Sequence, residues 1–323
     1  MTAKPAKPIY SLEGKRVWVN GYRGIVGSAV ARCLKDAGCE LLLTTSEQLD
    51  LRRQSDVEAW MRAKKPDAVF LIAATVGGIL ANDTRPAEFI YDNLAIEANV
   101  IHGAWKSGVG KLMLMGSACI YPREAPQPMP EESLLSGPLE PTSQWYGIAK
   151  IAGIKLVQAY RRQYGCDFIA ALPINLFGPG DNFDLQSSHV VPALIRKAHE
   201  AKSAGGEIMT VWGSGRPKRE FLYVDDVADA LKFLMERYSG ESHVNIGCGR
   251  ELTVRELAEA VARVVGFEGR IAFDSSKPDG APRKLLDSTR LRDMGWRART
   301  GLEDGLKKTY EWFLENVAGT LYK

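Results

Sequence analysis

A tyrosine and a lysine stand four residues apart near the middle of the sequence. Within the stretch YGIAK, Tyr146 and Lys150 would lie on one face of a helix. An ammonium beside a phenol lowers the pKa of the phenol, so this tyrosine is predicted to exchange a proton near neutral pH. Because the same spacing occurs by chance in many amphipathic helices, the pair is informative only if the fold brings it to a ligand.

A serine precedes this pair, just after a short apolar segment. Ser117 follows the strand expected at Lys111–Met115, and open α/β folds bind ligands at the carboxyl ends of their strands. Its hydroxyl would donate a second hydrogen bond to a carbonyl that Tyr146 protonates. These residues predict a site for proton transfer to a carbonyl group.

A glycine-rich loop follows the first expected strand, Arg16–Asn20, and opens a helix. Glycines there allow a tight turn and a close backbone approach, and the helix N-terminus offers free N–H groups to a pyrophosphate. The loop consists of Gly21, Tyr22, Arg23, Gly24, Ile25, Val26 and Gly27. Such turns are common, but this one is the first strand–helix turn of an alternating chain, which favours a dinucleotide.

The residues after the second strand bear on the type of dinucleotide. A carboxylate there binds a ribose 2′-hydroxyl, whereas a cation binds a 2′-phosphate. The segment Thr44–Asp50 holds no Arg or Lys and no acid directly at the strand end. Arg23 is the one nearby cation, either a phosphate ligand or a solvated loop charge. The sequence therefore favours NADP slightly, on Arg23 alone.

Strand and helix patterns alternate over the first half of the chain, which predicts a doubly wound, mostly parallel α/β sheet. The expected strands are 16–20, 40–44, 68–74 and 111–115. The expected helices are 28–37, 56–65, 93–107 and 146–165. The later pattern is mixed, with strands at 168–172, 209–212, 220–224 and 244–246. Its helices are expected at 190–203, 225–238, 253–265 and 302–316.

These patterns divide the chain into two expected domains. Residues 1–14 are rich in Lys and Pro and predict an N-terminal tail. Residues 15–175 would form the dinucleotide-binding domain. Residues 176–323 would form mainly a smaller, mixed α/β substrate domain. The chain is expected to cross back to the first domain near residues 220–250.

Composition excludes several classes of protein. The chain has 323 residues, a net charge of +3, 45% hydrophobic residues and 25% charged residues. This is the balance of a soluble globular protein, and it gives no reason to expect nucleic acid as a partner. We find no apolar run long enough to cross a membrane, and no signal peptide.

The cysteines predict neither a disulfide scaffold nor a metal site. No CxxC occurs among the five, and no Cys/His pair has zinc-ligand spacing. A reducing cytoplasm fits this pattern best. Cys33, Cys39, Cys166 and Cys248 are interpreted as small buried hydrophobic residues.

The GxxGxxG turn, the serine after the fourth strand and the YxxxK helix resemble the extended short-chain dehydrogenases that act on nucleotide sugars. Other segments resemble, more narrowly, the GDP-L-fucose synthase family. These are GSACIYP at 116–122, YGIAKIAG at 146–153, SHVVPAL at 188–194, VWGSG at 211–215, REFL at 219–222 and KPDG at 277–280. The resemblance extends from about residue 15 to residue 316 and implies a Rossmann sheet with a smaller substrate domain.

The resemblance implies that GDP-4-keto-6-deoxy-D-mannose is epimerised at C3 and C5 and then reduced at C4 by NADPH. Cys119 would be the base of the epimerisation and His189 the acid. Tyr146 and Ser117 would stabilise the enolate oxygen, which Tyr146 then protonates during reduction. Lys150 would bind the nicotinamide ribose and depress the pKa of Tyr146.

The same resemblance implies further binding residues and a partner. Besides the glycine loop, the coenzyme would contact Ser117, Lys150, Pro173, Asn175, Leu176 and His189. The GDP-sugar would contact Lys197, Trp212, Arg219 and Asp279. A homodimer is expected, in which the helices 93–107 and 146–165 of each subunit form a four-helix bundle.

Three departures from the family pattern and several alternatives remain. Ala118 replaces a second Ser. Tyr22 replaces a common His, and Ser46 stands where members often carry an Arg for the 2′-phosphate, so NADH is also a possible coenzyme. A reductase or 4-epimerase of another GDP-6-deoxy-4-keto sugar, including a heptose, would share most of the motifs. An inactive dinucleotide-binding regulator is the alternative from another class, although the intact Ser117, Tyr146 and Lys150 argue against it.

Overall fold

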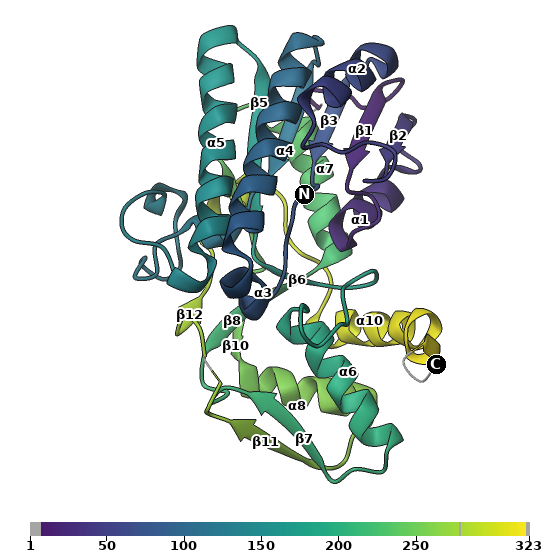
Figure 1. Cartoon of the computed structure of the whole chain (residues 1–323), viewed down its shortest axis with the longest axis vertical. Coiled ribbons are helices and arrows are strands. Elements are labelled where there is room, and N and C mark those ends of the chain that lie inside the picture. The colour runs from purple at the N-terminus through teal and green to yellow at the C-terminus, as the bar shows by residue number, and fades with distance from the viewer. Residues whose placement is uncertain (1–7, 278, 321–323) are drawn as a thin grey trace, which may run out of the picture.

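The computed structural model describes residues 8–277 and 279–320, and its centre is a six-stranded parallel sheet (Figure 1). The strand order is β2-β1-β3-β4-β5-β9, and all five pairings are parallel. The strands are β1 (Arg16–Asn20), β2 (Glu40–Thr44), β3 (Ala68–Leu71), β4 (Lys111–Met115), β5 (Asp167–Pro173) and β9 (Val244–Ile246). This confirms the doubly wound, mostly parallel sheet.

Two groups of helices enclose this sheet. In one group α4 packs between α2 and α5, and in the other α1 packs on α7 (Figure 1). The helices are α1 (Ile25–Leu34), α2 (Gln54–Lys64), α4 (Pro86–Lys106), α5 (Gln144–Tyr164) and α7 (Val224–Arg237). Because both faces of the sheet are covered, β3 is apolar along its whole length and β4 is apolar after Lys111.

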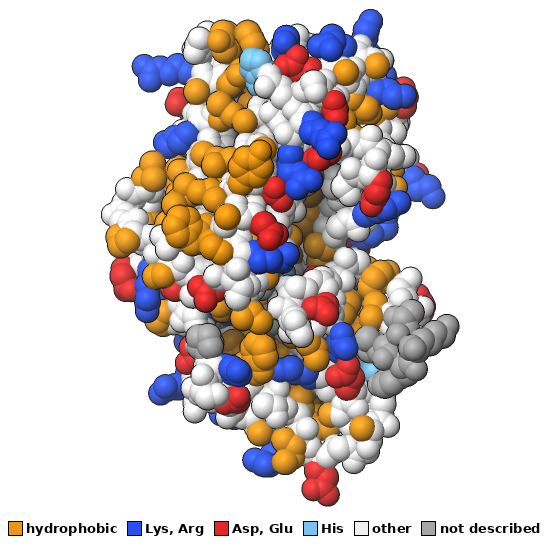
Figure 2. Space-filling model, in the orientation of Figure 1, with side chains coloured by type: hydrophobic (Ala, Val, Ile, Leu, Met, Phe, Trp, Pro, Cys, Tyr) orange, Lys and Arg blue, Asp and Glu red, His pale blue; other side chains and the backbone are white. Residues whose placement is uncertain are grey.

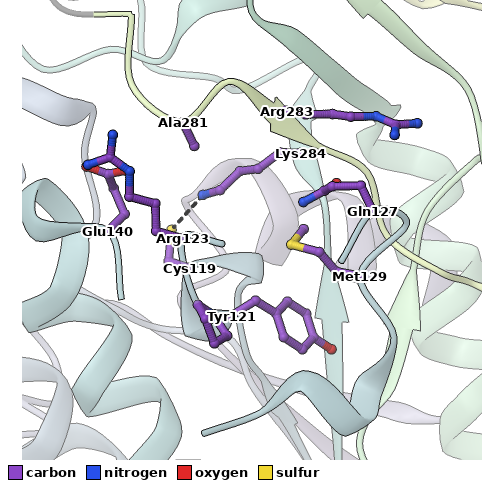
Figure 3. A pocket seen from close by; sticks show the side chains of 10 residues that line it. Cys119, Tyr121, Arg123, Gln127, Met129, Glu140, Ala281, Arg283 and Lys284 are labelled. Carbon is purple, nitrogen blue, oxygen red and sulfur yellow. Dashed lines mark hydrogen bonds and ion pairs between the residues drawn. The ribbon is translucent and has the colours of Figure 1, made fainter. Parts of the chain in front are cut away.

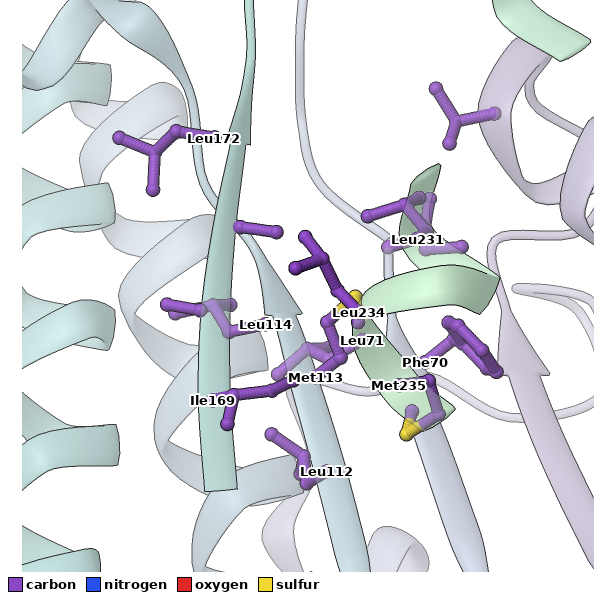
Figure 4. Close-up of a cluster of buried hydrophobic side chains, with 14 of the residues drawn as sticks. Phe70, Leu71, Leu112, Met113, Leu114, Ile169, Leu172, Leu231, Leu234 and Met235 are labelled. Carbon is purple, nitrogen blue, oxygen red and sulfur yellow. The ribbon is translucent and has the colours of Figure 1, made fainter. Parts of the chain in front are cut away.

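The core lies between these strands and α7. Leu231 and Leu234 of α7 are fully buried and lie against side chains of β3 and β4, including Phe70 and Met113 (Figure 4). Burial of each such side chain contributes about 1.5–3 kcal/mol to folding. The packing fixes the carboxyl ends of β1, β3, β4 and β5, and the candidate site residues follow these ends.

A second lobe lies below the sheet in Figure 1 and is built on short strands. β8 (Lys218–Tyr223) pairs with β6 (Asn175–Phe177), β10 (Glu251–Thr253) and β12 (Arg283–Lys284). β7 (Ile208–Trp212) pairs with β11 (Arg270–Asp274). The helices of this lobe are α6 (Val190–Ser203), α8 (Val254–Val265) and α10 (Leu302–Asn316). Thr253 caps α8 in a capping box with Glu256.

The chain passes between the lobes more than once. β8 belongs to the lower sheet and runs directly into α7, which packs on α1. The next strand, β9, then joins the edge of the central sheet. A return was expected near residues 220–250. The residue limits of the two domains stay a prediction.

The structure differs from the sequence-based elements at several ends. α4 begins at Pro86 rather than at residue 93, because proline suits the first turn of a helix. β3 ends at Leu71 rather than at residue 74. The side chain of Asn20 accepts hydrogen bonds from the backbone N–H groups of Ile72 and Ala73 and so replaces the neighbouring strand there.

Short elements account for most of the other differences. The sequence analysis did not predict α3 (Ile79–Thr84), α9 (Thr289–Asp293) or the strands β6, β10, β11 and β12. The expected tail also differs in part. Ile9 and Tyr10 donate to the carbonyl of Glu236, and Leu12 is buried, so residues 9–14 belong to the first lobe. The rest of that tail, residues 1–7, lies outside the described residues.

Candidate active site

The glycine loop joins β1 to α1 in a turn that excludes side chains at two of its glycines. Gly21 has a φ of +69°, which favours glycine. A Cβ on Gly27 would collide with the backbone of Gly21 and Tyr22. Among the described residues, no side chain caps α1 at Gly24, so its first N–H groups stay free for a ligand. The loop therefore has the geometry of a pyrophosphate cradle.

Arg23 lies exposed on this loop beside the end of β2. Its Nη1 lies 3.3 Å from Oε2 of Glu47, and both side chains are about two-thirds exposed. An exposed pair of this kind contributes little to stability. It leaves the guanidinium free to exchange Glu47 for a phosphate.

Ser117, Tyr146 and Lys150 come together below the end of β4. Ser117 caps the short turn Ala118–Ile120, where its Oγ accepts the N–H of Cys119. Tyr146 and Lys150 are buried in the first turns of α5, and the Lys150 ammonium lies 5.7 Å from the centre of the Tyr146 ring. Gly147 allows this approach, because a Cβ there would lie 2.7 Å from the carbonyl oxygen of Cys119.

The pKa of Tyr146 corrects one expectation from the sequence. Burial raises the pKa of Tyr146 to about 12, although Lys150 acts in the opposite direction. In this state the side chain is a phenol at neutral pH rather than a group poised to ionise. A buried phenol suits a proton donor to a developing alkoxide better than it suits a general base.

Cys119 differs from the other four cysteines in having a lowered pKa, whereas theirs are raised. The Nζ of Lys284 on β12 lies 3.8 Å from its Sγ, across the pocket in Figure 3. Burial opposes ionisation of the thiol, but Lys284 and hydrogen bonds from Ser117 and Ser143 outweigh it and lower the pKa of Cys119. In contrast, burial raises the pKa of Cys166. The thiolate is the nucleophilic and basic form of cysteine, so the lowered pKa makes Cys119 the candidate among the five for such chemistry.

This contact predicts the alkylation behaviour of the thiol. Removing the ammonium in Lys284→Met should raise the pKa of Cys119, so the rise of alkylation rate with pH moves to higher pH. We expect alkylation by iodoacetamide at pH 7.5 to slow by about tenfold, the equivalent of one pKa unit. Mass-spectrometric peptide mapping measures the extent of alkylation at Cys119 and at Cys166 in the same sample. An equal slowing at Cys166 would contradict the assignment to Lys284.

His189 stands at the N-cap of α6, with a side chain that solvent reaches. Surrounding protein and the charge of Lys284 lower the pKa of His189, so the imidazole is mostly neutral at neutral pH. Lys284 thus acts on both Cys119 and His189. The adjoining loop lies against α3, where the N–H of Gly78 donates to the carbonyl of Ser187.

The predicted substrate residues form a second group in the lower lobe. The ammonium groups of Lys197 and Lys277 lie 4.9 Å and 5.4 Å from the centre of the Trp212 ring, which is 47% exposed. Asp279 accepts two hydrogen bonds from Ser214, and Arg219 donates to the carbonyl of Asp279. An exposed aromatic face between cations suits a base and its phosphates. Within the quoted segment KPDG, Pro278 lies outside the described residues.

The remaining predicted coenzyme residues follow the end of β5. Pro173 ends β5, while Asn175 and Leu176 lie on β6. The amide of Asn175 donates to the carbonyl of Glu220, so this side chain ties β6 to β8 within the lower lobe, in addition to any role beside a coenzyme. No cluster of metal-ligating side chains occurs among residues 8–277 and 279–320.

Comparison with known proteins decides the family. Residues 17–247 match the NAD dependent epimerase/dehydratase family. A GDP-L-fucose synthase of Sinorhizobium fredii is 60% identical over 311 residues, which cover 96% of this chain and 99% of that protein. The chain belongs to the GDP-L-fucose synthase family.

Solved structures of related enzymes agree with this family at the level of the fold. A GDP-L-fucose synthetase from Naegleria fowleri bound to NADP has a TM-score of 0.88 at 28% identity, with 96% of this chain and 97% of that chain covered. A GDP-6-OMe-4-keto-L-xylo-heptose reductase from C. jejuni also has a TM-score of 0.88, at 32% identity, with 95% and 99% covered. The sequence resemblance to the GDP-L-fucose synthases is confirmed.

The sequence analysis did not predict two residues that lie near the site, Lys284 and Glu97. Lys284 is 165 residues from Cys119 in the sequence, and no motif marks it. Glu97 of α4 forms a buried ion pair with Lys150, whereas a glutamate within a helix pattern suggests a solvated face. The short segment KLLD around Lys284 gives no signal. A glutamate among buried positions of α4 is the only hint for Glu97.

Proposed function

We propose that this chain converts GDP-4-keto-6-deoxy-D-mannose to GDP-L-fucose by epimerisation at C3 and C5 and reduction at C4 with NADPH. One observation carries the proposal: the thiol of Cys119, with its lowered pKa, adjoins the phenol of Tyr146. A plain ketoreductase needs the Ser117, Tyr146 and Lys150 set but has no use for an activated thiol. Family membership supports this reading over the reductase and regulator alternatives.

The residues divide the proton transfers between them. Protons at C3 and C5 are acidic because the C4 ketone delocalises the resulting charge onto its oxygen. Cys119 removes such a proton as thiolate. His189 delivers one from the opposite face in its imidazolium form, which is the minor form at neutral pH because its pKa is lowered. Hydrogen bonds from Tyr146 and Ser117 stabilise the enolate oxygen during both epimerisations. Tyr146 finally donates its proton to that oxygen as C4 is reduced.

The chain's own residues fit the proposed coenzyme, NADP(H). The glycine loop and the free N-terminus of α1 would hold the pyrophosphate, with no Cβ to obstruct it at Gly21 or Gly27. Arg23 would bind the 2′-phosphate, and Lys150 the nicotinamide ribose. When bound, NADPH supplies the hydride for C4.

Product analysis in heavy water tests the proposal. The chain is incubated with GDP-4-keto-6-deoxy-D-mannose and NADPH in D₂O, coenzyme absorbance is followed, and deuterium is located by NMR. We expect one deuterium each at C3 and C5 of the product and one NADPH consumed per product. Coenzyme consumption without label at C3 and C5 would leave a 4-ketoreductase. No turnover of this substrate would favour another GDP-sugar, such as a heptose.

Coenzyme preference is predicted to depend on Arg23. Arg23→Ala removes the proposed cation of the 2′-phosphate, so the KM for NADPH should rise about tenfold, since a charge-assisted hydrogen bond contributes about 1.5–3 kcal/mol. The KM for NADH should change little. Steady-state kinetics with both coenzymes measures this. Glu47→Gln is the matched variant: it removes the competing carboxylate and should lower the KM for NADPH.

We further propose a homodimer in which α4 and α5 of each subunit form a four-helix bundle. Both helices carry large exposed apolar side chains, and hydrophobic side chains gather over this region in Figure 2. They are Tyr91 (68% exposed), Leu94 (37%), Trp145 (39%), Ile148 (40%) and Tyr164 (46%). Patches of this kind on a soluble protein mark interfaces.

Charge on this patch should dissociate the proposed dimer. Tyr91→Glu with Ile148→Glu places two carboxylates in the expected interface, and we expect the molar mass from light scattering to fall from twice the chain mass of 35.6 kDa to that mass. Ile208→Glu on β7, which is 48% exposed outside the patch, is the control. A dimer that survives the double variant would exclude this interface.

Over residues 8–277 and 279–320, none of the helices has the length and apolarity that a membrane span requires. The proposed substrate is a small, charged nucleotide sugar, in keeping with the cations around Trp212.

A further inference from the structure

The catalytic lysine has a buried counter-charge that the proposed mechanism does not use. Oε1 of Glu97 lies 2.8 Å from Nζ of Lys150, and their side chains are 2% and 1% exposed. Glu97 comes from α4 and Lys150 from α5, so the pair crosses the helix interface. Within the part of the chain that the structure describes, the ammonium's other hydrogen bond goes to the carbonyl of Met115, at 3.1 Å.

The opposite side of the carboxylate rests on a glycine. A Cβ on Gly153, one turn after Lys150 on α5, would collide with Oε2 of Glu97 and lie 3.0 Å from the side chain of Leu114. Glycine costs about 1 kcal/mol relative to alanine within a helix, so its presence here has a packing reason. The missing side chain creates the space in which the carboxylate meets Lys150.

We propose that Glu97 is a positioning residue that holds the Lys150 side chain in place and keeps it charged at working pH. This inference rests on the proposed function, in which Lys150 binds the coenzyme ribose and acts on Tyr146. A buried ammonium with a single carbonyl partner would lose its proton readily, because low-dielectric surroundings disfavour the charged form. The negative charge of Glu97 stabilises the ammonium and so opposes its deprotonation.

The charge of Glu97 acts on Lys150 in this direction, while burial outweighs the effect of Lys150 on Glu97 and raises the pKa of that carboxyl. Burial alone would lower the pKa of Lys150, but Glu97 and, to a lesser extent, Tyr146 raise it above the usual value. The titratable groups acting on Tyr146 are Lys150, Cys119 and Glu97. Glu97 directly opposes ionisation of Tyr146 as well, so it keeps the phenol protonated while its partner keeps the positive charge.

Glu97→Gln tests the proposal, since it preserves size and an acceptor oxygen but removes the charge. The pKa of Lys150 should fall, because burial is then unopposed by a carboxylate. Lys150 then loses its positive charge, and with it its contact to the coenzyme ribose, at lower pH, so the alkaline limb of the pH profile of kcat/KM for reduction should move about 1–2 units toward lower pH. Activity at pH 6 should suffer far less than activity at pH 8.5. A merely structural role would lower activity by one factor at every pH.

A titration without substrate or coenzyme separates this inference from the proposed function. The enzyme is labelled with [ε-¹³C]lysine, and the signal of Lys150 is assigned by its loss in Lys150→Arg. Its titration midpoint should be lower in Glu97→Gln than in the unaltered chain. An unchanged midpoint in a folded variant would overturn the inference, whichever sugar the enzyme reduces.

Three further variants test whether the shift of the pH profile depends specifically on the charge and the position of Glu97. Glu97→Asp keeps the charge and should restore most of the alkaline limb. Gly153→Ala displaces the carboxylate without removing it and should move the limb as Glu97→Gln does. Glu58→Gln is the matched control, because Glu58 forms a 2.7 Å pair with Lys106 at the other end of α4. An equal shift in Glu58→Gln would contradict a specific role for Glu97.

Discussion

Cys119→Ser is expected to abolish deuterium incorporation at C3 and C5 while the site can still reduce the C4 ketone. A serine hydroxyl has no accessible anionic form at neutral pH, whereas Lys284 lowers the pKa of the Cys119 thiol. Loss of a positioned general base costs about 10²–10⁴-fold in rate. In heavy water the variant should consume NADPH slowly and give a product reduced at C4 with protium at C3 and C5.

The control for this variant is another cysteine of the same chain. Cys166 lies just after α5, and burial raises its pKa. Cys166→Ser should therefore exchange and reduce as the unaltered enzyme does. Exchange at C3 that persists at full rate in Cys119→Ser would remove Cys119 from the role of base and leave its contact with Lys284 without a catalytic purpose.

The companion variant His189→Asn separates the two faces of the sugar. If His189 is the acid, proton removal by Cys119 continues, but delivery from the opposite face fails. Label should then enter C3 or C5 with the original configuration, and little epimer should form. Rapid inversion in this variant would show that another group, or water, supplies the proton.

Much of the site could be predicted because its residues form contiguous patterns. The YxxxK spacing and the glycine loop are local in sequence, and the structure places both at the carboxyl end of the central sheet. The order of strands follows from the alternation of apolar runs and helices, since covered parallel strands are apolar throughout. The strand at 111–115 and the helix at 190–203 agree with the structure residue for residue.

The remaining features depend on distances that a linear pattern does not contain. Lys284 meets Cys119 across 165 residues, and Glu97 meets Lys150 across two packed helices. The pKa of Tyr146 was predicted to be near neutral from the Lys150 charge alone. Burial has the larger effect and raises it to about 12. The degree of burial becomes known only when Phe89 and Ala81 are seen to pack on the ring.

Tyr146→Phe should have the largest effect on reduction. Phenylalanine preserves the edge-on packing against Phe89, whose ring centre lies 6.4 Å away, so the fold should be unchanged. The variant lacks the proton that the C4 oxygen must receive as the ketone is reduced. We expect kcat for NADPH oxidation to fall about 10³-fold, within the range for a lost general acid. Stopped-flow absorbance under single-turnover conditions measures this step directly.

Tyr146→Phe also shows whether Tyr146 stabilises the enolate or acts only as the proton donor in reduction. If Tyr146 also stabilises the enolate, exchange at C3 and C5 should fall by about 10²-fold, the cost of one donor to an oxyanion, even though Cys119 is intact. Tyr160→Phe is the control, because Tyr160 lies on the same helix, and its hydroxyl contacts His102 at 2.7 Å, far from the site. If reduction is lost while exchange stays at full rate, Ser117 alone holds the enolate oxygen. Tyr146 then acts only as the proton donor, as its raised pKa permits.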